Sequence, residues 1–384
     1  MEKYLTYLEY LLRMIIGVPK EIKDKENRVA LAPEGVKLLV SNGHNVFVEK
    51  SAGIGSGFPD GEYSRQGATV VSAKKAWSTD LIAKVKEPLE NEYSLLNQKT
   101  ILFTFLHLAG VDKSLTVSLL QKKVTAIAYE TVEDENGRLP LLAPMSAIAG
   151  NMSVTIGSYY LAKFNNGKGV QLGNVMDSHF GKVVIIGDGV VGTHCARTAN
   201  GMGANTYVFT LNLEKSNKLK DLIGRGVNIE LSSRDNIAKH VKDADLVVGA
   251  VLVHGAKAPY VVTEAMVKTM QPGSVIVDVS IDQGGCIETS RPTSHSNPVY
   301  VKHGVTHYCV TNMPGAYPRT STIALTNATL PYVLKLANDG IVNYAKHDLG
   351  FAKGINTYRG IITYRPVAQA LNLEGVFRDL IDLM

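Results

Sequence analysis

The chain has 384 residues, of which 45% are hydrophobic and 20% charged, and this predicts a globular α/β protein of two or three domains. Its net charge of +5 is spread without a basic block and no apolar run could span a bilayer, so nucleic-acid and membrane partners are not expected. The cysteines are far apart and lack C-x-x-C spacing, which predicts reduced thiols in a cytoplasmic protein: Cys195, Cys286 and Cys309.

The first half of the chain alternates short apolar runs with amphipathic segments, as βαβ architecture requires. Residues 1–13 are predicted to be an N-terminal extension with a short amphipathic helix, because the first core strand begins at Ile15. We expect helices at residues 34–41 and 114–121. The expected strands are residues 15–18, 45–48, 81–85, 101–106 and 125–128.

The second half begins with a turn-rich passage at residues 140–150, which leads into a long predicted helix at residues 149–164. A second alternating series covers residues 182–313, and beyond it residues 321–337 and the C-terminus read as mostly helical. We therefore expect an α/β fold of two Rossmann-like domains, with parallel sheets flanking a cleft and joined by long helices. The expected parts are a substrate domain, residues 14–140 and 319–384, and a dinucleotide-binding domain, residues 141–318.

A glycine-rich turn is the most informative motif. Residues 187–192 read G-D-G-V-V-G, directly after the apolar run 183–186 and before a helical segment at 193–202. Glycines at this spacing allow a tight turn, close approach to a pyrophosphate and packing of helix on strand. The context predicts a dinucleotide site, and a purely structural βα turn is the alternative.

Four side chains of the first half stand near the ends of predicted strands. Arg28 could grip a carboxylate with its planar guanidinium, and a surface arginine is an equal alternative. Alternation would send Lys84 and Lys86 to one face, where they form either an anion or carbonyl site or a solvated strand end. His107 follows an apolar run and is placed for general acid–base work, although a structural histidine is the commoner finding.

The second half offers fewer candidates. Asp278 and Asp282 flank a V-S-I segment before a glycine-rich loop, and of the two Asp278 reads as structural. Cys286 is predicted to be a small buried residue. His303 and His307 have the i, i+4 spacing of a metal pair, but in a strand that spacing separates them by roughly 13 Å, so no metal site is predicted.

Taken together, these segments resemble the NAD-dependent alanine dehydrogenase family over residues 14–373. The strings that carry the resemblance are GVPKE at 17–21, RVA at 28–30, KVKEP at 84–88, FTFLHLA at 103–109, AYETV at 128–132, LLAPMS at 141–146, GAVLV at 249–253, IDQGGC at 281–286 and NMPGAYPRTST at 312–322.

The resemblance implies reversible oxidative deamination of L-alanine to pyruvate and ammonia with reduction of NAD. It implies that Arg28 and Lys86 bind the substrate carboxylate, with Lys86 also reaching the carbonyl oxygen. His107 would be the acid–base group and Asp282 a second catalytic group that handles water and ammonia. Asn312 would lie near the nicotinamide and the substrate.

The resemblance also implies a cytoplasmic homohexamer whose partners are L-alanine, pyruvate and ammonium, with NAD as cofactor and no metal. The positions that match cofactor-binding ones are Ser146, Gly187, Gly189, Val190, Val191, Gly192, Thr210, Lys215, Ser232, Val251, Leu252, Val279, Ser280, Ile281, Asp282, Arg291, Val310, Asn312 and Met313.

The chain departs from the family pattern mainly in the cofactor half. Thr210 stands where the family has an aspartate that binds the adenosine ribose, so NADP is an alternative cofactor, with Lys215 nearby. Asp188 lies inside the glycine turn and should weaken binding if it faces the phosphates, but not if it faces solvent. The remaining departures are Ala147 and Asn151 in place of a glutamate and an arginine, and residues 173–178 in place of a glycine- and proline-rich loop.

Two other functions compete with the dehydrogenase. One is a soluble NAD(P)-binding part related to the transhydrogenase alpha subunit, a family that lacks the histidine at His107. The other is a dinucleotide-binding protein that has lost turnover, which the intact Arg28, Lys86, His107 and Asp282 oppose.

Overall fold

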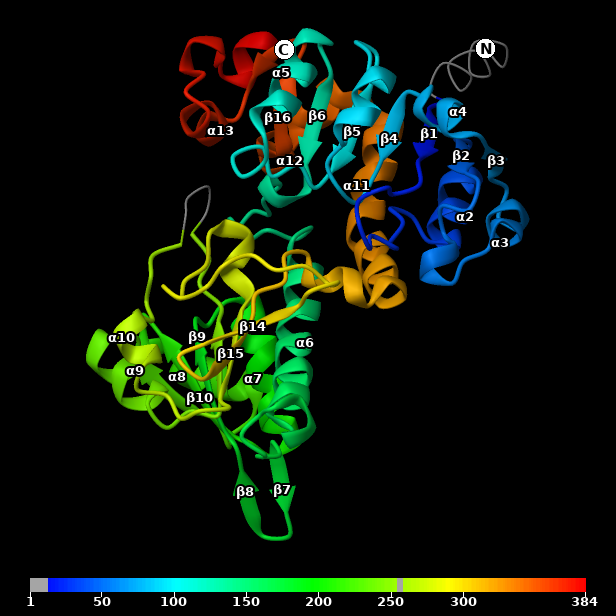
Figure 1. Ribbon diagram of the computed structural model, residues 1–384. Helices are drawn as coiled ribbons and strands as arrows, with labels where there is room; N and C mark the ends of the chain where they lie inside the picture. The colour runs from blue at the N-terminus through cyan, green and yellow to red at the C-terminus, as the bar shows by residue number, and fades with distance from the viewer. Residues whose placement is uncertain (1–12, 254–257) are drawn as a thin grey trace, which may run out of the picture. The chain divides into compact units, whose positions relative to one another are not determined.

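The computed structural model describes residues 13–253 and 258–384, so the predicted extension at residues 1–13 lies almost wholly outside the described residues. The chain forms two compact units, shown in Figure 1. Unit 1 holds the residues up to Pro144 and those from Tyr317 onward, and unit 2 holds Met145–Ala316.

Unit 1 is built on an eight-stranded sheet in the order β17-β16-β6-β5-β4-β1-β2-β3. The six strands from the first half of the chain are parallel, and β16 and β17 are added antiparallel at one edge. Taken in chain order, β1 to β6 have the arrangement 3-2-1-4-5-6 of dinucleotide-binding folds. The strands are β1 (Ile15–Val18), β2 (Asn45–Glu49), β3 (Thr69–Val71), β4 (Leu81–Ala83), β5 (Ile101–Thr104), β6 (Thr125–Ala128), β16 (Ile355–Tyr358) and β17 (Ile361–Ile362).

Helices connect these strands. The longest, α11, contains Gly340 at φ 70, where the helical path is interrupted. The helices are α2 (Pro33–Ser41), α3 (Asp60–Arg65), α4 (Ala73–Trp77), α5 (Lys113–Gln121), α11 (Pro318–His347), α12 (Leu349–Gly354) and α13 (Arg365–Ala370).

Unit 2 contains a seven-stranded sheet in the order β11-β10-β9-β12-β13-β15-β14, which again follows 3-2-1-4-5-6 with one antiparallel edge strand, β14. Its strands are β9 (Lys182–Ile186), β10 (Asn205–Thr210), β11 (Asn228–Leu231), β12 (Leu246–Gly249), β13 (Val275–Asp278), β14 (Val299–Lys302) and β15 (Val305–Tyr308). The helices are α6 (Ala143–Leu161), α7 (Val190–Met202), α8 (Ser216–Ile223), α9 (Arg234–Val241) and α10 (Glu264–Val267), and β7 (Gly173–Val175) and β8 (Ser178–Phe180) form a projecting hairpin (Figure 1).

The core of unit 2 explains why β9 is apolar throughout. Val183 and Ile185 pack into the hydrophobic cluster on one face of the sheet, and Val184 and Ile186 pack into the cluster on the other. A parallel strand that is covered on both faces needs an apolar residue at every position. The prediction of an α/β fold with two Rossmann-like domains is therefore confirmed.

Several predicted element bounds are wrong. The long helix begins at Ala143, well inside the expected turn-rich passage, because Pro144 is tolerated in a first helical turn. The strand predicted at 81–85 ends at Ala83, so both lysines lie beyond it and the alternation argument does not apply to them. The C-terminal part is mostly helical, as predicted, but the prediction lacked β16 and β17, which extend the sheet of unit 1.

The two histidines that suggested a metal pair have separate partners. His303 lies in the turn before β15 with φ 54, and its Nε2 is 2.6 Å from Oε1 of Glu264. His307 is fully buried: its Nδ1 donates to the Val305 carbonyl at 2.9 Å, and the Thr289 hydroxyl donates to its Nε2 at 2.7 Å. Burial lowers the pKa of His307 to about 4.

The buried histidine should make the protein sensitive to acid. The folded-state pKa of His307 is about 4 and its ordinary value is 6.5, so the unfolded chain binds the extra proton first. Stability that is fully present above pH 6.5 is then lost toward pH 4, by about 3 kcal/mol. Urea unfolding at pH 7 and pH 4 should show a smaller difference in His307→Gln than in the wild type. An equal difference in the two proteins would contradict the assignment.

Candidate functional site

The carboxyl ends of β1, β4 and β5 lie side by side at one edge of the unit 1 sheet, because these strands are parallel neighbours. The strand order changes direction between β1 and β4, and open α/β sheets bind ligands at such a point. Arg28 follows β1, Lys86 follows β4 and His107 follows β5. The fold therefore brings the three unit 1 candidates to the same edge of the sheet.

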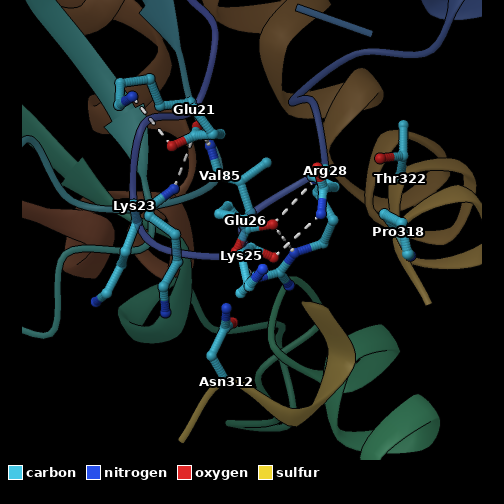
Figure 2. Close-up of polar contacts among 12 residues, drawn as sticks. Glu21, Lys23, Lys25, Glu26, Arg28, Val85, Asn312, Pro318 and Thr322 are labelled. Atoms are coloured by element: carbon cyan, nitrogen blue, oxygen red, sulfur yellow. Dashed lines mark hydrogen bonds and ion pairs between the residues drawn. The ribbon is translucent and has the colours of Figure 1, made fainter. Parts of the chain in front are cut away.

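Arg28 is held by a carboxylate two residues earlier. Nε donates to Oε1 of Glu26 at 2.7 Å, and Nη2 donates to Oε2 at 2.6 Å, in the bidentate arrangement drawn in Figure 2. The Arg28 side chain is 2% exposed and that of Glu26 is fully buried. The surface-arginine alternative is therefore wrong, and the plane of the guanidinium is fixed.

Helix α11 holds the segment that carries Arg28. Thr322 accepts from the amide of Val29 at 3.1 Å, and Thr326 accepts from the amide of Ala32 at 2.9 Å. Because both hydroxyls are buried and belong to one helix, the loop between β1 and α2 is fixed at two points.

Lys84 forms a buried charge cluster. Its ammonium lies 3.1 Å from Glu21 and 3.2 Å from Glu92, and all three side chains are nearly or completely buried. Burial lowers the pKa of Lys84, but the two carboxylates outweigh that effect, so the pKa is raised overall. The solvated-strand-end alternative is wrong for Lys84, whose role is structural.

The same cluster fixes the backbone that leads to Lys86. Glu21 accepts the amides of Val85 at 2.6 Å and Lys86 at 3.4 Å, and the first of these contacts is visible in Figure 2. The carbonyl of Lys86 accepts the Thr104 hydroxyl at 2.9 Å. Burial raises the pKa of Glu87, but the charges of Lys86 and Lys23 outweigh it and lower the pKa overall. Lys86 is thus a buried cation on a fixed backbone.

His107 is positioned by Glu130, which follows β6. Oε1 of Glu130 accepts the amide of His107 at 2.6 Å and lies 3.8 Å from its Nδ1. His107 has φ 47, a left-handed conformation that non-glycine residues adopt only where the surroundings impose it. Its ring stacks on Phe105, with 5.7 Å between ring centroids, and 38% of the side chain is exposed. This exposure favours a reactive group over a structural histidine.

The packing around the glycine turn of unit 2 shows which of its positions have room for a side chain. At Gly187, with φ 116, a Cβ would lie 2.3 Å from the Ala250 carbonyl oxygen, and at Gly192 it would lie 1.9 Å from that of Gly187. Gly189 has nothing within 4 Å of such an atom. Packing therefore excludes a side chain at Gly187 and Gly192. Gly189 has open space beside it, at the point where α7 begins. The turn fits a pyrophosphate at a helix N-terminus.

The loops after β12 and β13 are tied together next to this turn. The Ser280 hydroxyl donates to the Val251 carbonyl at 2.8 Å and accepts the Val251 amide at 3.0 Å. Asp278 accepts the amides of Ser280, Cys286 and Ile287, and burial raises its pKa. Asp278 is therefore structural and Cys286 is buried, as the sequence predicts.

Asp188 and Thr210 lie at the ends of the adjacent strands β9 and β10. The Thr210 hydroxyl is 2.9 Å from Oδ2 of Asp188, to which it donates. The Asp188 side chain therefore points to the end of β10 and is half-buried, so it does not face open solvent. Lys215, in the segment that follows β10, is exposed.

The other predicted site residues of unit 2 differ in their exposure and in their contacts. Asp282 is exposed in the short helix after β13, and Asn312 is half-buried with φ 67, its carbonyl 3.1 Å from Nε2 of His295. The guanidinium of Arg291 lies over the ring of Tyr300 at 4.2 Å. Of the remainder, Ser280, Ile281, Val310 and Met313 are buried, Ser146, Val191, Ser232, Val251 and Val279 are half-buried, and Val190 and Leu252 are exposed.

Two of the departures from the family pattern have a clear structural setting. Asn151 accepts the Thr198 hydroxyl at 3.0 Å, so it joins α6 to α7 without a charge. Residues 173–178 contribute to the hairpin of β7 and β8, where Met176 is 95% exposed.

Sequence reasoning missed the carboxylates that hold the candidate site, namely Glu21, Glu26 and Glu130. Each lies within ten residues of a strand end, and Glu130 stands in a string that carries the family resemblance. Their partners could not be predicted, because two of the three act on a different segment of the chain. Within residues 13–253 and 258–384, no three His, Cys, Asp or Glu side chains are grouped as a metal site, and no helix is long and apolar enough to cross a membrane.

Known proteins resemble this chain over nearly its whole length. An alanine dehydrogenase of Staphylococcus haemolyticus is 52% identical over 363 residues, covering 94% of this chain and 97% of that protein. Alanine dehydrogenase 2 of Staphylococcus aureus is 50% identical with the same coverage. A solved L-alanine dehydrogenase structure is 50% identical with a TM-score of 0.89, covering 94% of this chain and 99% of its own. A transhydrogenase structure from Sinorhizobium meliloti, 24% identical with a TM-score of 0.77 and covering 91% and 99%, shares the fold.

Family models agree with these relatives. The model of the alanine dehydrogenase/PNT N-terminal domain matches residues 17–149, and that of the C-terminal domain matches residues 153–365. The resemblance predicted from the sequence is confirmed, and this chain belongs to the alanine dehydrogenase/PNT family.

Proposed function

We propose that this chain catalyses the reversible oxidative deamination of L-alanine, in which L-alanine, NAD and water give pyruvate, ammonium, NADH and a proton. Relatives named alanine dehydrogenase, about half identical over nearly the whole chain, support the activity. The observation that carries the proposal is the gathering of Arg28, Lys86 and His107 at the switch point of unit 1.

Arg28 and Lys86 are the proposed substrate anchors. Glu26 fixes the plane of the Arg28 guanidinium, and a fixed plane suits a carboxylate ligand. Lys86 adds a buried positive charge beside the carbonyl oxygen of pyruvate, which gains negative charge as ammonia adds to the carbon. Asn312 is proposed to lie near the nicotinamide and the substrate.

His107 is the proposed acid–base group. It would take a proton from the attacking water and return it to the leaving ammonia through the carbinolamine. Glu130 fixes its backbone, and its partial exposure leaves the ring accessible to a substrate. Asp282, an exposed carboxylate in unit 2, is the proposed second group for these proton transfers.

The proposed cofactor site is the carboxyl edge of the unit 2 sheet. Bound NAD supplies the hydride acceptor, and the residues hold and orient it. The α7 N-terminus at Gly189 suits the pyrophosphate. The other proposed contacts are Ser146, Gly187, Val190, Val191, Gly192, Thr210, Lys215, Ser232, Val251, Leu252, Val279, Ser280, Ile281, Asp282, Arg291, Val310, Asn312 and Met313.

An assay of reductive amination tests the proposal. Purified full-length protein should oxidise NADH when both pyruvate and ammonium are present and not when either is omitted. Folded protein that turns over with neither NADH nor NADPH would overturn it in favour of a dinucleotide-binding role without turnover. Hydride exchange between NADH and an NADP analogue, without need for pyruvate, would favour the transhydrogenase-related alternative.

A cytoplasmic homohexamer is part of the same proposal. All three cysteines are free and buried, as expected of a reduced protein, and the β7–β8 hairpin exposes apolar side chains that a neighbouring subunit could cover. Light scattering should give a mass of about six times 41.5 kDa. A monomer at micromolar concentration would contradict this part.

A further inference from the structure

The end of β10 lacks the group that this fold normally places there. In dinucleotide-binding domains an acidic residue about 20 residues after the glycine turn accepts the 2′-hydroxyl of the adenosine ribose. Thr210 occupies that position, and its side chain is a hydroxyl with 1% exposure. A threonine alone provides no negative charge to bind the ribose or to repel a 2′-phosphate.

A carboxylate nevertheless reaches this point from the neighbouring strand. β9 and β10 are paired in parallel with Ile186 opposite Phe209, so the residues that follow them leave the sheet together. The Thr210 hydroxyl lies 2.9 Å from Oδ2 of Asp188. The acidic group is therefore not lost from this edge of the sheet, but originates inside the glycine turn.

Local contacts fix the carboxylate. The Thr210 hydroxyl accepts the Asn212 amide at 3.1 Å, and its own proton has two acceptors, Oδ2 of Asp188 at 2.9 Å and the Asn212 carbonyl at 3.2 Å. The shorter, charge-assisted bond is the one to Asp188. The Asp188 carbonyl accepts the Thr193 hydroxyl at 3.2 Å, so the backbone is held as well. Within the described residues, Oδ1 of Asp188 makes no hydrogen bond, and the residue is half-buried. One oxygen is thus anchored and the other can accept a bond from a ligand.

We propose that Asp188 is the residue that selects the cofactor, with its carboxylate accepting the 2′-hydroxyl of the adenosine ribose in place of an acid at the end of β10. This inference rests on the proposed function, because it assigns a role within the proposed NAD site. The negative charge of Asp188 would repel a 2′-phosphate. The exposed Lys215 would attract a 2′-phosphate if Asp188 were absent. The chain therefore prefers NAD over NADP despite Thr210.

Titration calorimetry with NADH, NADPH and an NADH analogue that lacks the adenosine 2′-hydroxyl tests this role. The wild type should lose about ten- to hundredfold in affinity for the analogue, the value of a hydrogen bond to a charged group. Asp188→Ala should lose a similar factor for NADH, bind the analogue no more weakly than NADH, and gain in relative affinity for NADPH. Asp221→Ala, an exposed aspartate of α8, is the matched control and should behave as the wild type.

A double variant separates the role from simple damage to the turn. Asp188→Ala combined with Thr210→Asp returns a carboxylate to the end of β10 and should restore the preference for NADH. The inference is overturned if Asp188→Ala retains the wild-type ratio of NADH to NADPH affinity, or if it still loses affinity for the analogue. Turnover of wild-type protein in that case leaves the proposed function standing, whereas a wild type that binds no dinucleotide removes both.

Discussion

His107→Ala should lower turnover by about 10²- to 10⁴-fold, the usual contribution of a positioned acid–base group, while the dissociation constant for NADH stays unchanged. NADH binding should be unaffected because the proposed acid–base group and the proposed cofactor site belong to different units. His107 follows β5 in unit 1, and the glycine turn that fits the dinucleotide is in unit 2. Stopped-flow or steady-state assays give the first quantity, and calorimetric titration with NADH gives the second.

The histidine at the end of α11, His347, provides the matched control. It is exposed and its Nδ1 lies 2.8 Å from the Asn343 carbonyl in its own helix, so His347→Ala should retain activity. If His107→Ala keeps wild-type turnover, the acid–base role passes to another group. A loss of NADH binding in the same variant would instead indicate general damage to the fold.

Lys84→Met should lower the free energy of unfolding by about 3–5 kcal/mol, the typical cost of removing one partner from a buried ion pair. Methionine fills similar space, but Glu21 and Glu92 would then share a buried site without a cation. Since Glu21 also accepts the amide of Val85, loss of stability should be accompanied by weaker pyruvate binding at Lys86. Chemical denaturation and the KM for pyruvate measure the two effects.

Two further variants check this explanation. Adding Glu21→Gln to Lys84→Met removes one unpaired charge and should recover part of the lost stability. Lys99→Met, at an exposed lysine, should change stability by no more than about 0.5 kcal/mol. A Lys84→Met protein as stable as the wild type would show that the cluster does not hold the loop.

Much of the fold could be predicted because parallel strands buried on both faces are apolar at every position. All five strands predicted in unit 1 begin at the predicted residue. Two end early, and at 81–85 the reason is visible, since the Val85 amide donates to Glu21 and not to a neighbouring strand. The short strands β3 and β16 were missed, because Thr69–Val71 and Ile355–Tyr358 are too brief to show a period and are held by their neighbours in the sheet.

The residues of the candidate site could be predicted from the sequence, but the side chains that hold them in place could not. Strand ends and the family resemblance both indicated Arg28, Lys86 and His107. Whether a charged side chain is buried depends on its partners, and Glu26 and Glu130 are identified as partners only in three dimensions. Asp188 shows the same limit, because no sequence pattern indicates that a residue inside a glycine turn bonds to Thr210.

Hydride transfer from the α-carbon of alanine is the central chemical claim, and one isotope measurement tests it directly. The protein is incubated with NAD and L-alanine that carries deuterium at Cα, and the reduced cofactor is analysed by mass spectrometry. We predict NADH that is one mass unit heavier, formed together with pyruvate in equal amount. Unlabelled NADH, or no reduced cofactor from folded protein that binds NAD, would contradict the assignment.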